Sequence, residues 1–522
     1  MKIWLDNCSA NHRDCGSKET PFLPTRVIDV EKICLHISLN GERSHYLALS
    51  YCWGGPQIFK TTNDTLASKT TALPLNALPK TLRDAVEITK QLGFRYLWID
   101  SLCIIQDSES DVAVEINRMH LIFKHSTITI AAEVPSTVEQ GFLHPRVLTK
   151  AVKFPFSTGA GIQGSVWTTP YDQQQLFGAL ATRAWAFQEI ILAPRLMIFS
   201  PRGIMWWCRS ASFQQDPLER KLGIENHLYN RRKSCRDAFS LKPGIIIPDS
   251  SYMSLLRGWR DIVSEFLGLG ISFHRDRLPA LAGIAHEYQS RIKDQYVAGM
   301  WLRRLVSQLG WRRRSDKSSL LPAPQHTEEN VAPSWSWASV NAPIFLSDIF
   351  LVYMESTRAH VLGCQIEPLH QAAPFGQVKH GRLEVAAFML PIEKISGLLL
   401  SCMDSTGAAF KANNQEGVIQ CMVLGVITSN NTAYLEGLYL EALDDGIFRR
   451  IGLFRNSLTR AELRSEAAYN AWIDELGDAR YYGASCSYDD WRNGQYYDNP
   501  DDYDDYGGWV VHLSKRERFI IV

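Results

Sequence analysis

Three side chains that could take part in chemistry follow one apolar segment of the chain. The stretch YLWIDSLCIIQ, residues 96–106, starts as a buried strand pattern and then places Asp100, Cys103 and Gln106 close together. A carboxylate can act as a general acid or base, and a thiolate can act as a nucleophile. Asp100 could face a ligand or take part in catalysis, or it could cap the turn into the next helix. Gln106 is a candidate ligand-binding residue beside it.

Cys103 could be a catalytic nucleophile if a nearby base or positive charge lowered the pKa of its thiol. His45, His120 and His125 are the local candidates for that base. The alternative is structural, because a free cysteine is usually a small buried hydrophobe.

Glu115 is the third candidate catalytic residue. It borders the apolar stripe of the helix predicted to follow, which is formed by Val112, Ile116, Met119 and Phe123. A partly buried glutamate near a cleft could have a raised pKa and serve as an acid or base. Alternatively, Glu115 is an ordinary carboxylate at the flank of the stripe, paired with Arg118 three residues later.

Three short apolar segments, 46–51, 96–100 and 127–132, are predicted to be strands. A helix is predicted between the first two, where Thr81 with Asp84 resembles a capping box and Gly93 ends the helix. Strands that are apolar on both faces and alternate with helices predict an α/β fold with a parallel sheet covered on both sides.

Ligands of an open parallel sheet bind beyond the carboxyl ends of the strands. Ser50, Tyr51 and Trp53 follow the first predicted strand, and Glu133 follows the third. If the sheet is parallel, these side chains and Asp100 lie along one edge. We therefore expect Ser50, Tyr51 and Trp53 to bind a ligand there.

A second helix pattern, residues 181–195, places Arg183, Trp185, Gln188 and Glu189 close together. Arg183 and Trp185 are candidate ligand-binding residues. Gln188 and Glu189 could hold Arg183 or Arg195 structurally, or they could help to line a pocket.

Cys8, His12 and Cys15 have the spacing C-x3-H-x2-C. This spacing could bind a zinc ion if a fourth ligand joined it, for instance Cys34 or Cys52. No second CxxC pair follows, so we predict no metal site from the sequence. Walker-type, HExxH and GxSxG motifs are also missing from the sequence.

The bulk composition narrows the class of protein. The 522 residues carry a formal net charge of zero, which gives no sign of a nucleic-acid partner. The sequence contains no segment of about 18 apolar residues, so we predict no membrane span. Eleven scattered cysteines and an N-terminus without a secretory pattern predict reduced thiols and a cytoplasmic location.

Changes in sequence pattern predict four parts. A lead-in over 1–44 precedes an α/β domain over 45–210, a helical region over 211–330 and a β-rich C-terminal domain over 331–522. The stretch 481–507, rich in tyrosine and aspartate, is predicted to be a flexible acidic insertion in that last domain.

Several blocks of the chain together resemble the fungal heterokaryon incompatibility (HET) domain family. These blocks are CSANHRDC with LPTRVIDV, then YLALSYCWGG, then the long block from LPKTLRDAV to INRMHLIF, then RAWAFQEIILAPRLMIF and WWC. The downstream stretches DRLPALAGIA, YVAGMW and APSWSWASV are also similar to this family. Val112 departs from the pattern, which usually has a tryptophan there.

The resemblance implies an intracellular protein of nonself recognition that triggers programmed cell death, through self-association or an incompatibility partner. It also implies a fold similar to TIR domains, with a flavodoxin-like sheet. Some TIR domains cleave NAD with a helical glutamate, and Glu115 is at the corresponding place in the order of elements. The alternative is an enzyme: an NAD glycohydrolase with NAD as its substrate, or a tailoring enzyme of secondary metabolism.

Overall fold

A computed structural model describes most of the first half of the chain and parts of the second. The described residues are 1–12, 15, 19–144, 152–158, 161, 163–168, 178–201, 203–210, 212–214, 249–313, 331–342, 344–346, 359–387, 389–391, 398–403, 419–429, 432–444, 446–459 and 517–522. The predicted acidic insertion over 481–507 lies outside these ranges.

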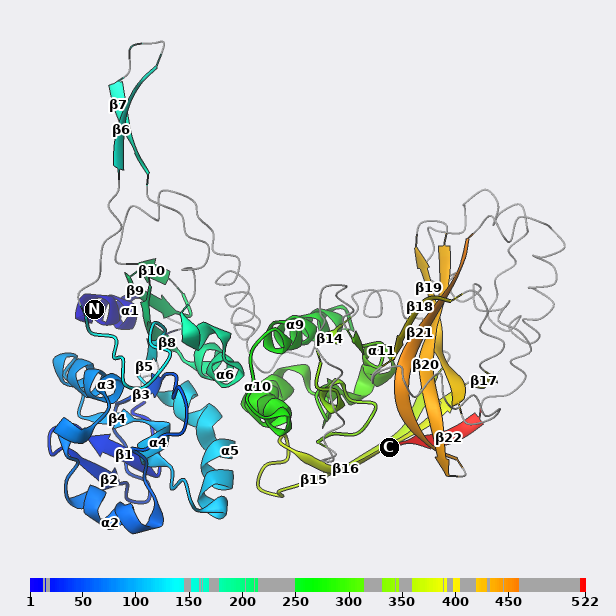
Figure 1. Cartoon of the computed structure of the whole chain (residues 1–522), viewed down its shortest axis with the longest axis horizontal. Helices are drawn as coiled ribbons and strands as arrows, with labels where there is room; N and C mark the ends of the chain where they lie inside the picture. Colours follow the sequence, from blue (N-terminus) through cyan, green and yellow to red (C-terminus); the bar gives the residue numbers. More distant parts are fainter. Residues whose placement is uncertain are drawn as a thin grey trace. The chain divides into compact units, whose positions relative to one another are not determined.

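The chain forms two compact units (Figure 1). The first comprises residues 1–241 and 269–271, and the second comprises 242–268 and 272–522. The finer division into four parts stays a prediction. Among the described residues, no helix is long and apolar enough to cross a membrane.

The first unit is built on an eight-stranded sheet of order β10-β9-β8-β5-β3-β4-β1-β2. Its centre is parallel: β3 (Tyr46–Ser50) lies between β4 (Tyr96–Trp98) and β5 (Ile128–Ala132), and β8 (Arg195–Ser200) lies beside β5. Every residue of these four strands is buried, as expected for strands covered on both faces. The predicted parallel α/β arrangement is therefore confirmed.

Helices on both faces make the connections of this parallel centre. Helix α3 (Lys80–Gln91) joins β3 to β4, and α5 (Glu109–His125) joins β4 to β5 on the opposite side of the sheet (Figure 1). Right-handed crossovers require this arrangement, because the chain reverses direction across the sheet after β4. Helix α6 (Ala184–Leu192) packs against α5, so the two share a face.

Antiparallel strands complete both ends of the sheet. Strands β1 (Arg26–Asp29) and β2 (Cys34–Ile37) form a hairpin. Strand β8 pairs with β9 (Gly203–Cys208), which pairs in turn with β10 (Ser212–Gln214). A separate hairpin consists of β6 (Val152–Ser157) and β7 (Gln163–Thr168). The remaining helices here are α1 (Lys2–Asn11), α2 (Asn63–Thr71) and α4 (Asp100–Cys103), with short 3-10 turns η1 (Leu75–Ala77) and η3 (Ala179–Thr182).

The predicted capping box at Thr81 and Asp84 is wrong. Helix α3 begins at Lys80 after Pro79, so Thr81 already lies inside its first turn. The Thr81 hydroxyl instead accepts a hydrogen bond from the N–H of Gly141, and the Asp84 carboxylate accepts from the N–H groups of Phe142 and Leu143. Both side chains form hydrogen bonds with the loop after β5 in place of a cap at the start of α3.

The second unit combines helices with a large sheet. Its helices are α9 (Asp249–Leu267), α10 (Arg277–Ile292) and α11 (Leu305–Gln308), with 3-10 turns η4 (His274–Asp276), η5 (Leu302–Arg304) and η6 (Trp337–Ser339). Short strand pairs are β11 (Tyr296–Val297) with β12 (Met300–Trp301) and β13 (Arg312–Arg313) with β14 (Ile344–Phe345). The helices agree with the helical pattern predicted over 211–330, whereas the short strands β11, β12 and β13 within that range were not predicted.

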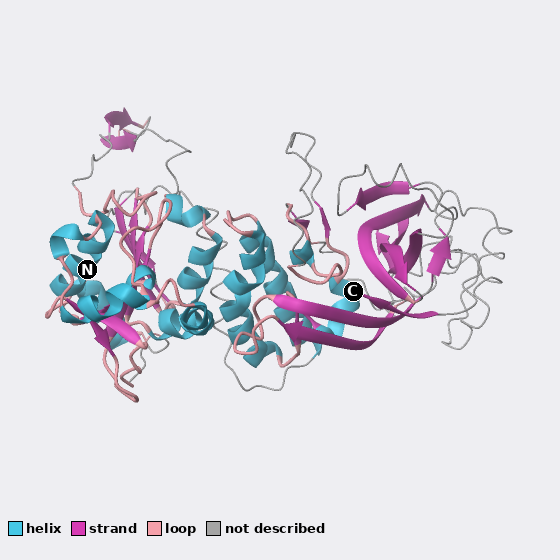
Figure 2. Ribbon diagram, turned by 60° about the horizontal axis from the view of Figure 1, so that its bottom comes forward, coloured by secondary structure: helices cyan, strands magenta, loops and turns pink. Residues whose placement is uncertain are grey.

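The predicted β-rich C-terminal part is confirmed by a sheet of order β15-β16-β22-β21-β20-β19-β17, to which β18 adds by pairing with β21 (Figure 2). All pairs are antiparallel except β21 with β22. The bounds are β15 (His360–Pro368), β16 (Val378–Ala387), β17 (Met389–Pro391), β18 (Leu398–Met403), β19 (Ile419–Ser429), β20 (Thr432–Asp444), β21 (Ile447–Thr459) and β22 (Glu517–Ile521).

Candidate functional site

Polar side chains meet at the carboxyl ends of β3 and β4. The Asp100 carboxylate accepts a hydrogen bond from Trp53 Nε1 at 2.9 Å and one from the N–H of Ser101 at 2.6 Å. The Tyr51 hydroxyl donates to Ser101 Oγ at 2.9 Å and also interacts with Asp100. Four residues from two adjacent strand ends are thus joined around one carboxylate.

Two charged side chains reach this edge from α6 and the residue before it. Arg183 donates a hydrogen bond from Nη1 to the backbone carbonyl of Tyr51. Glu189 is buried, and its carboxyl interacts with the Ser50 hydroxyl at the end of β3. We call Ser50, Tyr51, Trp53, Asp100, Arg183 and Glu189 the strand-end cluster. All six lie near the carboxyl end of β3, whose two neighbours, β4 and β5, are reached by connections in opposite directions. Ligands usually bind at this position in open parallel sheets.

The two carboxyl groups of the strand-end cluster both hold their protons more tightly than usual. Burial and the charge of Asp100 raise the pKa of Glu189 to about 7, against the opposing effects of Ser50 and Arg183. Burial also raises the pKa of Asp100, against the hydrogen bonds from Tyr51, Ser101 and Trp53. A carboxyl group with a pKa near 7 can donate and accept protons at neutral pH. The cluster can therefore support acid–base chemistry.

Close backbone approaches hold the segments that carry the cluster. Gly178 precedes η3 and α6, and a Cβ atom added there would lie 1.9 Å from the carbonyl oxygen of Glu133 after β5. Gly54 follows Trp53 with a φ of +77°, and an added Cβ would lie 2.5 Å from Thr137. Glycine is required at both positions, because any side chain would displace a loop of the site.

Asp100 does not end its strand as predicted. Strand β4 stops at Trp98, Ile99 remains extended, and Asp100 is the first residue of α4. Its carboxylate accepts hydrogen bonds from the N–H of Ser101 within this single helical turn and from Trp53 Nε1, while the N-cap position of the turn is Ile99.

Gln106 and Trp185 lie beside the cluster. The Gln106 amide nitrogen donates to the carbonyl oxygens of Asp100 at 3.1 Å and Ile104 at 3.3 Å, so this side chain braces the α4 turn. Trp185 is half-buried and packs against the core of the first unit. Their predicted roles in ligand binding stay predictions.

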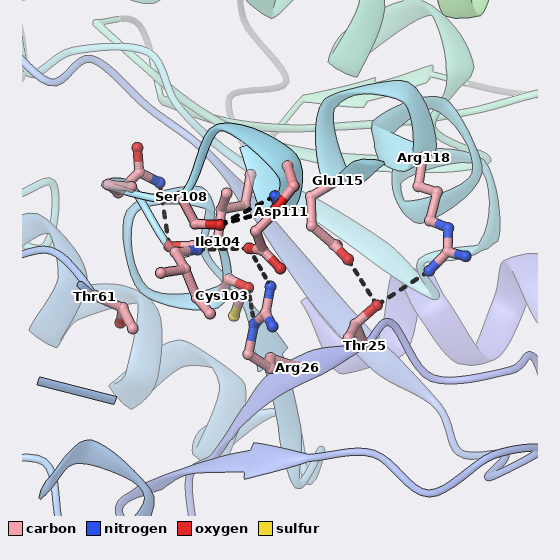
Figure 3. A network of polar contacts seen from close by, with 12 residues as sticks. Thr25, Arg26, Thr61, Cys103, Ile104, Ser108, Asp111, Glu115 and Arg118 are labelled. Carbon is pink, nitrogen blue, oxygen red and sulfur yellow. Dashed lines mark hydrogen bonds and ion pairs between the residues drawn. The ribbon is translucent and has the colours of Figure 1, made fainter. Parts of the chain in front are cut away.

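Glu115 belongs to a second polar network, beside β1 (Figure 3). Only 2% of Glu115 is exposed, and its Oε1 accepts a hydrogen bond of 2.7 Å from the Thr25 hydroxyl. Arg118 donates to the same hydroxyl at 3.4 Å, so it reaches Glu115 through Thr25. Burial raises the pKa of Glu115, while Thr25 and the charge of Arg26 lower it. Glu115 is thus a buried carboxyl whose main partner comes from a distant segment.

Arg26 is the centre of this second network. Its Nε donates to the carbonyl of Cys103 at 2.6 Å, and its Nη2 pairs with the Asp111 carboxylate at 2.5 Å (Figure 3). Asp111 also accepts from the N–H of Ile105 at 2.8 Å. Arg26 therefore fixes the turn between α4 and α5, and with it the position of Glu115.

The Cys103 thiol lies fully buried between the two groups of polar residues. It accepts a hydrogen bond from the N–H of Ile99 at 3.4 Å. Burial raises the pKa of the thiol to about 12, and the charges of Glu115 and Asp100 act in the same direction. His45 and His125, two of the bases suggested by the sequence, precede β3 and β5 and so lie at the opposite edge of the sheet. This environment favours the structural alternative for Cys103.

Four potential metal ligands meet elsewhere in the first unit. Cys8, His12 and Cys15 lie close to Cys208, the last residue of β9, rather than to Cys34 or Cys52. The fourth partner is thus about 190 residues away in the sequence, which is why local spacing did not reveal it.

Residues 46–189 match the family model described as heterokaryon incompatibility protein (HET). The chain contains a HET domain. The match begins at the first residue of β3 and ends at Glu189 on α6, so it includes the whole strand-end cluster. Thr25 and Arg26, the partners of the Glu115 network, lie outside the HET match. Comparison with curated proteins and with solved structures gave no match.

The sequence predicted five of the six cluster residues as site residues and gave Glu189 only as a possible pocket residue. Every residue of α6 is apolar except Gln188 and Glu189, and all nine but Trp185 are buried. A carboxylate within such an apolar helical segment is the feature of the sequence that could have identified Glu189 as a site residue.

Proposed function

We propose that this HET-domain protein acts in nonself recognition in the cytoplasm and triggers programmed cell death when it is activated. The observation that carries the proposal is the coincidence of the HET match with the strand-end cluster, since both include β3, β4 and the segment up to Glu189. We infer that activation involves self-association or an incompatibility partner, as the sequence resemblance implies.

The proposal is tested by inducible expression of the full chain in yeast, with growth and intracellular NAD followed together. Growth arrest after induction supports a cell-death function. Normal growth at a comparable protein level would contradict it and would favour the alternative of a tailoring enzyme in metabolism.

A second candidate function is cleavage of NAD at the bond between nicotinamide and ribose. The central strand order β4-β3-β5-β8, with β3 first in the chain, supports a TIR-like, flavodoxin-like assignment of the domain. Cleavage of this bond develops positive charge on the ribose, which a nearby carboxylate stabilises. Of the buried glutamates in the part of the chain that the structure describes, we consider Glu115 and Glu189 for this role.

The surroundings of the two glutamates suggest different roles. Glu189 lies with Asp100 and Arg183 at the strand ends, where a substrate of a parallel sheet binds. Glu115 is held by Thr25 beside β1. We therefore assign acid–base chemistry to Glu189 and retain Glu115 as the alternative.

Loss of NAD separates the enzymatic mechanism from signalling. If arrest is accompanied by NAD loss that disappears in Glu189→Gln but persists in Glu115→Gln, the strand-end cluster is the catalytic site. The reverse pattern would assign the reaction to Glu115. Arrest with unchanged NAD would remove the glycohydrolase mechanism and leave the signalling function in place.

A further inference from the structure

The first unit contains a cluster of three cysteines and one histidine that is separate from both polar networks described above. Cys8 is buried on α1, His12 directly follows this helix, Cys15 lies three residues further on, and Cys208 ends β9. One ligand atom from each residue lies within 4.8 Å of those of the other three. Three thiols and an imidazole are a ligand set typical of structural zinc.

The spacing of these atoms fits the edges of a metal tetrahedron. Zinc–sulfur and zinc–nitrogen bonds of about 2.3 and 2.0 Å place neighbouring ligand atoms about 3.5–3.8 Å apart in tetrahedral geometry. His12 Nδ1 lies 3.3 Å from Cys208 Sγ and 3.9 Å from Cys15 Sγ. The side chains are therefore already placed around a common centre of the right size.

Arg195, the first residue of β8, supplies a matching outer partner. Its Nε donates to Cys8 Sγ at 3.4 Å, and its Nη2 donates to the carbonyl of Cys15 at 2.7 Å. Zinc bound by three thiolates and one neutral histidine carries a net charge of −1. The buried guanidinium of Arg195 would balance that charge and orient two of the ligands.

Helix α1 needs such an anchor. Its ten residues bury only Leu5 and Cys8, and a helix of this length is marginal in water without tertiary contacts. The cluster joins the end of this helix to the β8–β9 hairpin, which is part of the central sheet.

We propose that Cys8, His12, Cys15 and Cys208 bind one structural Zn²⁺ ion that fixes the N-terminal helix to the HET-domain sheet. Four protein ligands close the coordination sphere, so no position is left for substrate or water, which makes the site structural rather than catalytic. Soft thiolate ligands select zinc over magnesium or calcium. Both ends of the site come from segments outside residues 46–189.

The first test is the metal content of the purified full chain, prepared under reducing conditions without chelator and measured by mass spectrometry of the elements. We expect about one zinc per chain, as for a closed four-ligand site. Cys208→Ser should lose most of it. Cys34→Ser is the matched control, because Cys34 lies on β2 in the same unit outside the cluster, and it should retain the zinc.

The second test does not depend on a variant that folds. Cobalt exchanged into the wild-type protein should give the visible bands of tetrahedral Co²⁺ and a thiolate-to-metal charge-transfer band. Removal of the metal by a chelator should lower the midpoint of thermal unfolding of the wild type.

Three results would overturn the proposal. The first is wild-type protein that contains no zinc and takes up neither zinc nor cobalt. The second is an intact mass lighter by two hydrogens in protein from a reducing cytosol, which would assign a disulfide to the cluster. The third is an equal loss of zinc in Cys34→Ser and Cys208→Ser.

Discussion

At the scale of single residues, the buried carboxyl of Glu189 is the most informative group of the HET domain. It lies on an apolar helix with Ser50, Asp100 and Arg183 as its charged or polar neighbours. None of these neighbours is close in sequence except Arg183. The raised pKa of the Glu189 carboxyl therefore depends on the tertiary fold. A change in the strand-end cluster should change this pKa.

We predict that Glu189 makes stability depend on pH. Its pKa is about 7 in the folded chain and near 4.5 in the unfolded chain, so the folded state holds a proton that the unfolded state has lost between these values. The contribution of Glu189 to stability is therefore fully present below about pH 4.5 and is lost as pH rises through 7, by up to about 3 kcal/mol. Glu189→Gln should remove this loss, measured as the difference in free energy of unfolding between pH 5 and pH 8.

The exposed Glu139 provides the control for this pH prediction. Glu139→Gln should keep the wild-type difference between the two pH values. An unchanged pH dependence in Glu189→Gln would show that this carboxyl titrates normally, and the acid–base role would be lost with it.

Arg26 allows a second prediction at this scale. Arg26→Ala leaves the Asp111 carboxylate and the Cys103 carbonyl without their buried partner, and we expect a loss of about 3 kcal/mol in the free energy of unfolding. Arg118→Ala removes an exposed side chain with one long hydrogen bond and should cost less than about 0.5 kcal/mol. Denaturant titration of both variants checks this, and equal effects would contradict the central role of Arg26.

At the scale of elements, the segment from Gly178 through α6 carries Arg183 and Glu189, two of the three charged side chains of the strand-end cluster. Gly178→Ala would place a methyl group against the Glu133 carbonyl, where the backbone cannot yield easily. We predict a loss of about 1–3 kcal/mol and a shift of Arg183 and Glu189 away from β3. Gly270→Ala is the control, since its added Cβ has an ordinary contact of 3.4 Å with Thr182. Thermal unfolding of both variants measures the difference.

The elements that sequence patterns predicted well are those whose pattern is local. The three parallel strands follow from short apolar segments, and the helix carrying Glu115 follows from apolar periodicity. The capping box failed because Asp84 found better partners in the N–H groups of Phe142 and Leu143, which no local pattern contains. Tertiary hydrogen bonds replaced a local cap there.

The candidate site also has residues that the sequence could predict and contacts that it could not. Ser50, Tyr51, Trp53 and Asp100 could be predicted because strand ends of a parallel sheet share an edge. The pairing of Glu115 with Thr25, and of Cys15 with Cys208, joins segments separated by 90 and more residues. Such pairings depend on the full strand order, which one sequence does not determine.

At the scale of the whole molecule, the second unit joins the predicted helical region to the predicted β-rich domain. Arg450 on β21 donates to the carbonyls of Leu309 at 2.6 Å and Trp311 at 2.5 Å, and its guanidinium lies 3.4 Å from the centre of the Trp311 ring. This buried arginine connects the sheet with the segment after α11. The second unit therefore includes residues 242–268 and 272–330 of the predicted helical region together with residues 331–522 in one compact body.

We predict that Arg450→Ala destabilises this unit by about 2–4 kcal/mol, because two buried carbonyls lose their donor. The neighbouring Arg449 pairs with Glu441 on the adjacent strand β20, where both side chains reach solvent, and Arg449→Ala should cost less than about 1 kcal/mol. Thermal unfolding of the two variants compares them directly. Similar midpoints for both would contradict a joining role for Arg450.

We infer that the strand-end cluster is needed for the cell-death function proposed for the HET domain. Growth of yeast that expresses a variant of this cluster tests this most directly. Glu189→Gln and Glu139→Gln chains are expressed in yeast at equal protein levels, and colony growth is measured after induction. We predict that the Glu139→Gln chain arrests growth like the wild type and that the Glu189→Gln chain allows normal growth. Arrest by folded Glu189→Gln at wild-type strength would contradict it.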